Sequence, residues 1–178
     1  MKSQFNLTYV QVNPDNMNLA YDIQKNTWPT DPDYNDLYDK AVNPLDDNCF
    51  FLVYDKDILI GITGVDVYRE YQDTIWLDWF TILPEFRRKG YGEKVLLDTI
   101  EYCKQLKRYK SFRVETTYYE NIPALFLYDK IMQAKEDYTI EDTNDLKTET
   151  LIYTYPLYGE LELWNNKYLG LREYYDNL

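Results

Sequence analysis

Short apolar runs alternate along this chain with segments in which apolar residues recur every three or four positions. The runs are bounded by turn residues, as strands are, and we expect strands at 7–12, 50–54, 58–67, 75–82, 111–117, 134–140 and 148–155. The second spacing is that of one helix face. It predicts helices that follow the cluster 13–16, pass through Tyr38 and Ala41, and cover about 91–107 and about 121–131. No repeat or low-complexity linker divides the pattern, so we expect one α/β domain over residues 1–178.

Two segments carry residues that simple alternation does not explain. Gly61 and Gly64 lie inside the third expected strand, which indicates a bulge or the close approach of another backbone. The C-terminal stretch 157–178 mixes leucine, tryptophan and tyrosine with acids and amides. A segment so aromatic is not expected to be disordered. We expect it to pack on the sheet or helices as an extension of the domain, with a dimer contact or a lid over a substrate cleft as the alternatives.

The most specific chemical signal lies between the strand at 75–82 and the helix that follows. Three consecutive cations, Arg87, Arg88 and Lys89, precede Gly90 and Gly92. In a chain of net charge −12 they reverse the local sign of charge. The first N–H groups of a helix have no internal partner, and glycine lets a ligand come close to the backbone. A polyanionic ligand is therefore expected at this turn.

Other classes of site are excluded by missing residues. The chain has no histidine, which removes His-based triads and His-ligated metals. Cys49 and Cys103 are far apart and have no CxxC partner, so we expect neither a zinc site nor a disulfide, and Cys103 fits a buried helix face. The basic turn is not a P-loop, and the third glycine position of a dinucleotide fingerprint is Val95. An enzyme of another class, such as a kinase, is therefore not expected.

Charge and hydropathy narrow the expected partners. An acidic chain lacks the basic face that nucleic acid requires, whereas it attracts a cationic amine. No run approaches the roughly 20 apolar residues of a membrane span. The first six residues lack the apolar run of a signal peptide, so the cytoplasm is the expected location. We expect no nucleic acid and no membrane as partners.

Two motifs in this chain resemble those of the GNAT superfamily of acyl-CoA N-acetyltransferases. The run from Arg87 to Gly92 fits the signature Gln/Arg-x-x-Gly-x-Gly/Ala. After the next strand, residues 121–130 (NIPALFLYDK) are similar to the family's Asn-x-x-Ala-x-x-Leu-Tyr-x-Lys. The resemblance is specific from 76 to 130. One departure follows, because the family usually continues Leu-Gly-Phe where this chain has Ile131, Met132 and Gln133.

The resemblance implies both a fold and an activity. The fold is a mixed, mostly antiparallel sheet of six or seven strands, flanked by helices and splayed at an acetyl-CoA cleft. The activity is direct transfer of an acetyl group from acetyl-CoA, as cosubstrate, to a primary amine of a small molecule or peptide, without a metal. The alternative is a non-catalytic protein that binds or senses CoA. A homodimer is compatible with either.

The match also assigns residues to the cofactor. Backbone groups of the splayed strand would bind the pantetheine arm, and one would stabilise the oxyanion. N–H groups of the turn would hold the pyrophosphate, and its cations would reach the ribose phosphate. The expected cofactor-binding residues are Phe80, Thr81, Ile82, Arg87, Arg88, Lys89, Gly90, Tyr91, Gly92, Glu93, Asn121 and Tyr128.

Catalytic roles follow from the same match and from the carboxylates nearby. Tyr128 aligns with the motif tyrosine that protonates the leaving thiolate. Without histidine, a carboxylate or water must act as general base. Asp78 is the first choice, because an acid inside an apolar strand is either paired or catalytic, and it lies two residues before Phe80 and therefore on the same face. Glu115 on the adjacent strand is the second.

Acceptor contacts are expected from loops beside the cleft, because such loops commonly carry binding residues. The expected substrate-binding residues are Trp28, Tyr34 and Tyr68.

Overall fold

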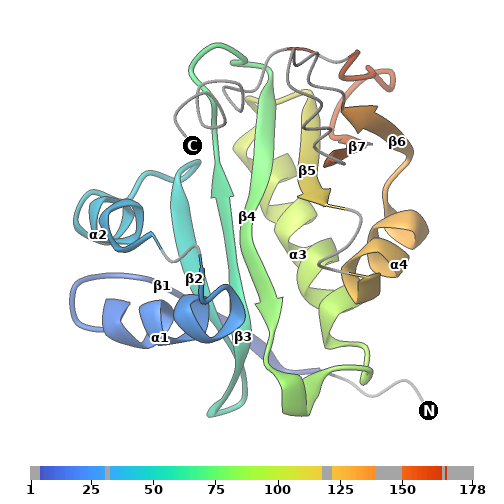
Figure 1. The fold of residues 1–178 in the computed structure, drawn as a ribbon. Helices are drawn as coiled ribbons and strands as arrows, with labels where there is room; N and C mark the ends of the chain where they lie inside the picture. The colour runs from blue at the N-terminus through green and yellow to red at the C-terminus, as the bar shows by residue number, and fades with distance from the viewer. Residues whose placement is uncertain (1–4, 31–32, 118–121, 139–149, 166, 168–178) are drawn as a thin grey trace.

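The computed structural model describes residues 5–30, 33–117, 122–138, 150–165 and 167. Within them one sheet has the strand order β1-β2-β3-β4-β5-β7-β6 (Figure 1). The strands are β1 (Leu7–Gln11), β2 (Cys49–Asp55), β3 (Ile58–Asp66), β4 (Thr74–Ile82), β5 (Ser111–Thr117), β6 (Ala134–Tyr138) and β7 (Thr150–Pro156). Neighbours are antiparallel except for β4 and β5, which are parallel. The expected mixed, mostly antiparallel sheet is confirmed.

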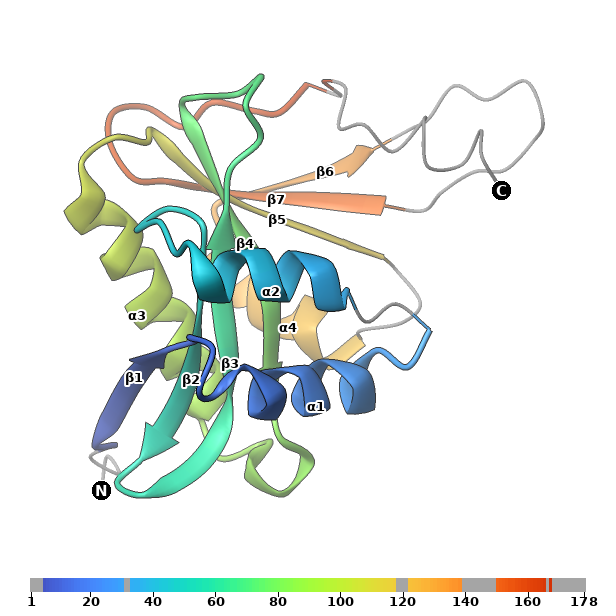
Figure 2. The same ribbon diagram turned by 90° about the vertical axis from the view of Figure 1, so that its left-hand side faces the viewer.

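Helices cover the two faces of the sheet unequally (Figures 1 and 2). They are α1 (Met17–Thr27), α2 (Tyr34–Val42), α3 (Tyr91–Leu106) and α4 (Ile122–Ile131), with a short 3-10 turn η1 (Pro84–Phe86). Apolar residues of α1 and α2 pack on one face of β2 and β3. Those of α3 and α4 pack on the other face, against β5 and β7, and Cys103 is buried there as expected. None of the helices in the described part of the chain is long and apolar enough to cross a membrane.

The two glycines of β3 mark a close approach between strands. A Cβ atom at Gly61 would lie 2.3 Å from the carbonyl oxygen of Thr81 on β4, a distance that real side chains do not reach. A Cβ atom at Gly64 would lie equally close to the ring of Phe50 on β2. Bulky residues at either position would push β3 away from its neighbours. The expected close approach is confirmed.

A β-bulge interrupts β4 beside Asp78. On β3, only Thr63 lies between the partners of Asp78 and Thr81, whereas on β4 both Trp79 and Phe80 lie between these two residues. Trp79 has φ +42°, a left-handed conformation that accommodates the additional residue. A bulge of this kind shifts the alternation of side chains between the two faces.

The bulge corrects one expectation from the sequence. Asp78 lies on the face covered by α2, where it contacts Lys40. Phe80 packs instead with the cluster that contains Val95 of α3, on the opposite face. The expectation that Asp78 and Phe80 share a face is therefore wrong, because it assumed an uninterrupted strand.

The chain after β7 turns round the end of the sheet. The backbone N–H of Leu157 donates to the carbonyl oxygen of Lys110 at 2.7 Å, just before β5 begins. Trp164 then lies in a cluster with Trp76 and Ile152, on the same face of the sheet as α1 and α2 but on a part that these helices do not cover, and it is 1% exposed. The described part of the C-terminal extension therefore packs on the sheet. Residues 166 and 168–178 lie outside the described residues, so the packing of the complete stretch stays a prediction.

Candidate active site

A cleft of about 400 Å³ opens where β4 and β5 part. The two strands pair at three positions, and the last pair is Trp76 with Arg113. Both strands contribute to the cleft beyond this point, together with the end of α1, the end of β3 and one side of α4. Its lining residues are Trp28, Asp66, Tyr68, Trp76, Leu77, Asp78, Trp79, Phe80, Val114, Glu115, Thr116, Thr117, Ala124 and Tyr128.

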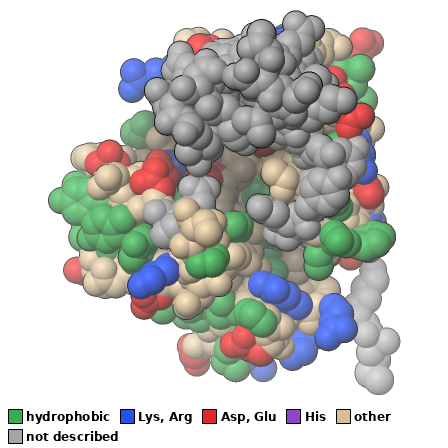
Figure 3. All heavy atoms as spheres, in the orientation of Figure 1, with side chains coloured by type: hydrophobic (Ala, Val, Ile, Leu, Met, Phe, Trp, Pro, Cys, Tyr) green, Lys and Arg blue, Asp and Glu red, His purple; other side chains and the backbone are tan. Residues whose placement is uncertain are grey.

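The turn that leads into α3 lies open at the surface. Arg87, Arg88, Lys89 and Gly90 are exposed, and Figure 3 shows Lys and Arg side chains gathered over this part of the molecule, at its lower right. Gly90 has φ +90°, which glycine adopts without steric cost. Nε of Arg87 donates to the carbonyl oxygen of Ile82 at 2.8 Å and so ties the turn to the end of β4. An exposed helix N-terminus with this geometry can hold a phosphate.

The first turn of α3 is fixed by its neighbours. The hydroxyl of Tyr91 donates to Asp55 of β2 at 2.6 Å. Glu93 forms an ion pair with Lys130 of α4 at 2.5 Å. Gly92 lies between them and is half-buried. The two sequence motifs therefore meet in space, because Glu93 follows the first motif and Lys130 ends the second.

The strand residues expected to bind pantetheine divide into two groups. Thr81 and Ile82 are buried and pair with β3, whereas Phe80 lines the cleft. In the described residues β4 has no pairing with β5 after Trp76. Backbone groups on that edge of β4 therefore face the cleft without a strand partner, as binding to an amide-containing ligand requires. Asn121, the remaining expected contact, lies outside the described residues.

Asp78 belongs to a network of charges centred on Lys40. The Lys40 side chain is 3% exposed, and Nζ lies 2.6 Å from Asp78, 3.1 Å from Asp36 and 3.2 Å from Asp66. Burial disfavours the charge on this ammonium, but the three carboxylates outweigh burial and raise the pKa of Lys40. Burial raises the pKa of Asp78 to about 6, although Lys40 acts to lower it. No group of described side chains is arranged to hold a metal.

Glu115 differs from Asp78 in having no counter-charge among the described residues. It lines the cleft from β5, and in the described residues it makes neither an ion pair nor a hydrogen bond. Burial alone raises the pKa of Glu115 to about 7. A carboxyl group of this kind exchanges its proton near neutral pH, as a general base must.

Tyr128 reaches the same cleft from α4. Its side chain is 5% exposed and its ring centroid lies 5.4 Å from that of Tyr153. Burial raises the pKa of the Tyr128 phenol, with a smaller contribution from Tyr153, so the hydroxyl stays protonated at neutral pH. This group can donate a proton but does not accumulate as a phenolate.

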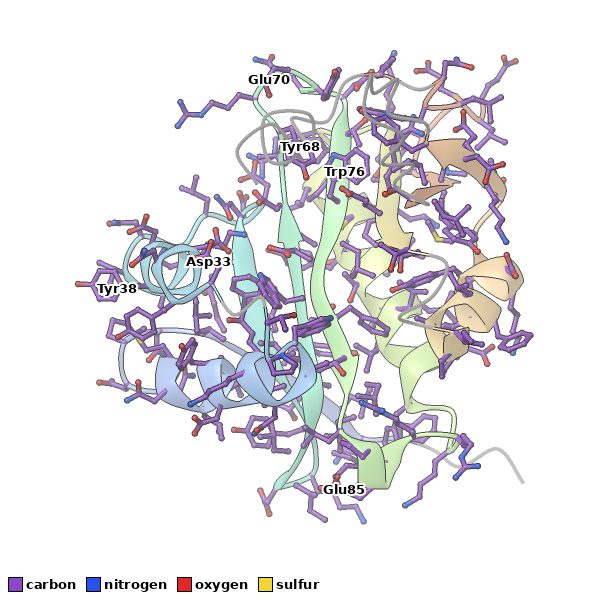
Figure 4. All side chains as sticks on the ribbon, in the orientation of Figure 1. Asp33, Tyr38, Tyr68, Glu70, Trp76 and Glu85 are labelled. Carbon is purple, nitrogen blue, oxygen red and sulfur yellow. The ribbon has the colours of Figure 1, made fainter. Side chains whose placement is uncertain are left out.

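Two of the three expected acceptor contacts lie at the cleft. Trp28 packs edge-on against Trp79 with ring centroids 4.9 Å apart. Tyr68 packs against Trp76 with ring centroids 5.4 Å apart, and Figure 4 labels both of these residues. Tyr34 is 44% exposed and does not line the cleft, so its expected role is not supported. Tyr34 begins α2 and its side chain points outward, because the buried face of that helix carries Leu37, Lys40 and Ala41.

Sequence reasoning missed the residues that surround the two carboxylates. Asp66, Trp76 and Trp79 line the cleft, and Lys40, which does not line it, forms an ion pair with Asp66. A signal for Lys40 was present, because it occupies the apolar stripe of α2 one turn after Asp36. No comparable signal marked Asp66, which ends a strand in an ordinary turn region.

The fold and the cleft define an acyltransferase architecture, and comparison with known proteins identifies its family. The model of the acetyltransferase (GNAT) family matches residues 14–132. The chain therefore belongs to this family and is an acetyltransferase. No curated protein sequence matches it.

Solved structures of N-acetyltransferases share the fold at low sequence identity. Arabidopsis thaliana NAA60 in complex with a bisubstrate analogue is 14% identical, with a TM-score of 0.65 over 85% of this chain and 98% of that one. The Escherichia coli ribosomal-protein-S18-alanine N-acetyltransferase is 17% identical, with a TM-score of 0.62 over 92% and 99%. Vibrio cholerae spermidine N-acetyltransferase in complex with CoA and spermine is 17% identical, with a TM-score of 0.63 over 83% and 92%.

Proposed function

We propose that the protein transfers an acetyl group from acetyl-CoA directly to a primary amine of a small molecule or peptide, with Glu115 as general base. One observation carries this proposal: Glu115 and Tyr128 line the same cleft. Glu115 is a carboxylate without a partner in the described residues and has a pKa near 7, and Tyr128 is a buried phenol. Two nearby features of the chain fit acetyl-CoA. The exposed turn at 87–92 offers cations and free N–H groups, and the unpaired edge of β4 offers backbone partners for the pantetheine amides.

Glu115 and Asp78 have different environments, which separates their roles. Asp78 is tied to a buried ammonium at 2.6 Å, so a proton would have to compete with Lys40 for it. Glu115 has no such competitor among the described residues and takes the proton from the acceptor ammonium, directly or through a water molecule. General base catalysis of this kind contributes about 10²–10⁴-fold in rate.

The remaining chemistry needs an oxyanion donor and a proton donor. Acetyl-CoA supplies a thioester carbonyl that the neutral amine attacks, and the carbon–nitrogen bond forms as the carbon–sulfur bond breaks. N–H groups on the open edge of β4 donate to the carbonyl oxygen as it gains charge. Tyr128 gives its proton to the leaving sulfur, and the acylated nitrogen releases its remaining extra proton to the Tyr128 phenolate, directly or through water, which restores the phenol. Alignment of the two substrates supplies about 7–11 kcal/mol of the barrier in well-oriented systems.

The walls of the cleft favour a positively charged acceptor. Three carboxylates, Asp66, Asp78 and Glu115, line the cleft, and no lysine or arginine is among its lining residues in the described part of the chain. Trp28 and Tyr68 add aromatic faces, to which an ammonium is attracted. An open cleft of about 400 Å³ also favours catalysis over the alternative of a protein that only binds CoA.

A screen of acceptors tests the proposal. The protein is incubated with acetyl-CoA and, separately, spermidine, a lysine-containing peptide and a peptide with a free N-terminus, and thiol release and product mass are measured. We expect amine-dependent thiol release with at least one acceptor and an increase of one acetyl group in its mass. Tight CoA binding by calorimetry without acetylation of any amine would support the non-catalytic alternative.

A further inference from the structure

Trp164 contacts both strands at the point where they part. Trp76 and Arg113 form the last pair of the β4–β5 ladder. The Trp164 ring centroid lies 5.1 Å from that of Trp76, edge to face, and the Arg113 guanidinium carbon lies 5.1 Å from the Trp164 ring centroid. All three side chains are at most 3% exposed. One residue of the C-terminal extension thus covers the apex of the opening between the strands.

Hydrogen bonds fix Trp164 in this place. Its backbone N–H donates to Glu136 of β6 at 2.6 Å, and the N–H of Asn165 donates to the other oxygen of the same carboxylate at 2.8 Å. The indole N–H donates to the carbonyl oxygen of Lys167 at 3.0 Å. The indole is therefore held rigidly against the apex instead of resting there as an adjustable side chain.

Arg113 is anchored on the same side. It donates to Thr154 of β7 at 2.5 Å, and to the carbonyl oxygen of Glu162 at 2.8 Å. The guanidinium thereby connects β5 to β7 and to the extension. A cation stacked on an indole and bonded on its edges is a strong point of attachment.

Asp78 and Glu115 come shortly after the apex along their strands. Trp76 precedes Asp78 by two positions on β4, and Arg113 precedes Glu115 by two positions on β5. The bulge lies after Asp78, so in both strands the residues two apart share a face. Trp76 and Arg113, the two residues that Trp164 contacts, therefore each lie one strand repeat, about 7 Å, before a carboxylate. The turn at 87–92, where the phosphate is proposed to bind, begins beyond Ile82, which lies about 20 Å along β4 from Trp76.

We propose that Trp164 is a positioning residue that sets how far β4 and β5 separate, and so the spacing between Asp78 and Glu115. These two carboxylates, with Asp66, line the part of the cleft that we call its acceptor half. The inference rests on the proposed function and adds a role for the C-terminal extension in transfer. Removal of the indole leaves a cavity between Trp76 and Arg113, which lets the strands shift. The turn at 87–92 is distant from this cavity, so we expect it to keep its geometry.

The test compares Trp164→Ala and Trp164→Phe with Leu163→Ala, a matched control whose side chain is 45% exposed in the same segment. With the acceptor found above, kcat and both KM values are measured. We expect Trp164→Ala to lower kcat at least tenfold and to move the acid limb of the pH profile away from 7, with KM for acetyl-CoA within twofold of wild type. Trp164→Phe is expected to be intermediate, and Leu163→Ala unchanged.

Hydrogen–deuterium exchange gives a readout that does not depend on activity. We expect Trp164→Ala to speed amide exchange at least tenfold in 74–77 and 111–114, without a change in β1 and β2. Unchanged exchange at the apex, or faster exchange throughout the sheet, would overturn the proposal. So would a lower melting temperature with kcat and the pH profile intact. If Trp164→Ala does not fold, Trp164→Phe decides by the same measurements. A wild-type protein that acetylates no amine would instead count against the proposed function, and the exchange data would still decide whether Trp164 holds the apex.

Discussion

The ammonium of Lys40 lies 2.6 Å from the carboxylate of Asp78, and this contact joins α2 to the strand that borders the cleft. Lys40 is almost completely buried, and its other partners, Asp36 and Asp66, are also carboxylates. The network therefore fixes the position of α2 and commits Asp78 to an ion pair. Glu115, which has no such partner among the described residues, is left as the better proton acceptor.

Replacing Lys40 with methionine tests the structural role of this network. Removal of the ammonium leaves three carboxylates facing one another, and breaking a buried pair costs about 3–5 kcal/mol. Because solvent reaches the carboxylates here, with side chains 24–37% exposed, we expect a loss at or below the lower end of that range, about 2–3 kcal/mol. Urea unfolding at pH 7 measures the change. A loss below about 0.5 kcal/mol, the scale of an exposed pair, would contradict the account.

Gly90→Glu tests the phosphate site. A glutamate here adds a repelling charge and a side chain at φ +90°, so we expect no measurable CoA binding in calorimetry. Gly159→Glu is the matched control, because Gly159 also has positive φ, at +77°, and a Cβ atom there would meet nothing within 4 Å. Equal CoA affinity in the two variants would show that the cofactor lies elsewhere.

Tyr128→Phe tests the proton donor. The substitution removes the hydroxyl and keeps the buried ring, so acetyl-CoA affinity should stay within about twofold. Turnover should fall by about one to three orders of magnitude, because CoA thiolate can leave slowly without a donor. Tyr158→Phe removes the hydroxyl of an exposed tyrosine outside the cleft, which donates to the carbonyl oxygen of Lys104, and serves as control. Wild-type turnover in Tyr128→Phe would remove this residue from the mechanism.

The raised pKa of Glu115 has a consequence for stability. Burial holds the folded-state pKa at about 7, above its ordinary value of 4.5, so the folded state binds a proton more tightly than the unfolded state. Stability from this group is complete below pH 4.5 and is lost as the pH rises through 7. Glu115→Gln should therefore unfold at higher urea than wild type at pH 8, with the gap closing toward pH 4.5. A gap independent of pH, or wild type more stable at pH 8, would contradict the environment assigned to Glu115.

The helices and strands could be predicted because each buries one face. In α3, for example, Val95, Leu96, Ile100 and Cys103 recur at helical spacing, and all four are buried against the sheet. The turn before α3 was predictable for a different reason, since its cations and glycines are contiguous in sequence. Local patterns of this kind do not depend on which segments meet in the fold.

The acceptor half of the cleft depends on contacts between distant segments, and sequence reasoning was weaker there. The bulge at Trp79 follows from the pairing of β4 with β3, and nothing in the local run marks it. The partner of Asp78 lies 38 residues earlier in the chain. A lysine on an apolar helix face signals a buried ion pair but does not name its partner. The proposal of Glu115 in preference to Asp78 therefore rests on contacts that only the structure shows.

The pH dependence of acetyl transfer by wild type, Glu115→Gln and Asp78→Asn tests the central claim most directly, with Glu101→Gln on the exposed side of α3 as a control. Only the deprotonated form of a base accepts a proton, so wild-type kcat/KM should rise with pH through about 7. Glu115→Gln should lose about 10²–10⁴-fold in kcat and should lack this limb, whereas Asp78→Asn should retain it. Loss of the limb in Asp78→Asn, with near wild-type kcat in Glu115→Gln, would contradict the account and return the role of base to Asp78.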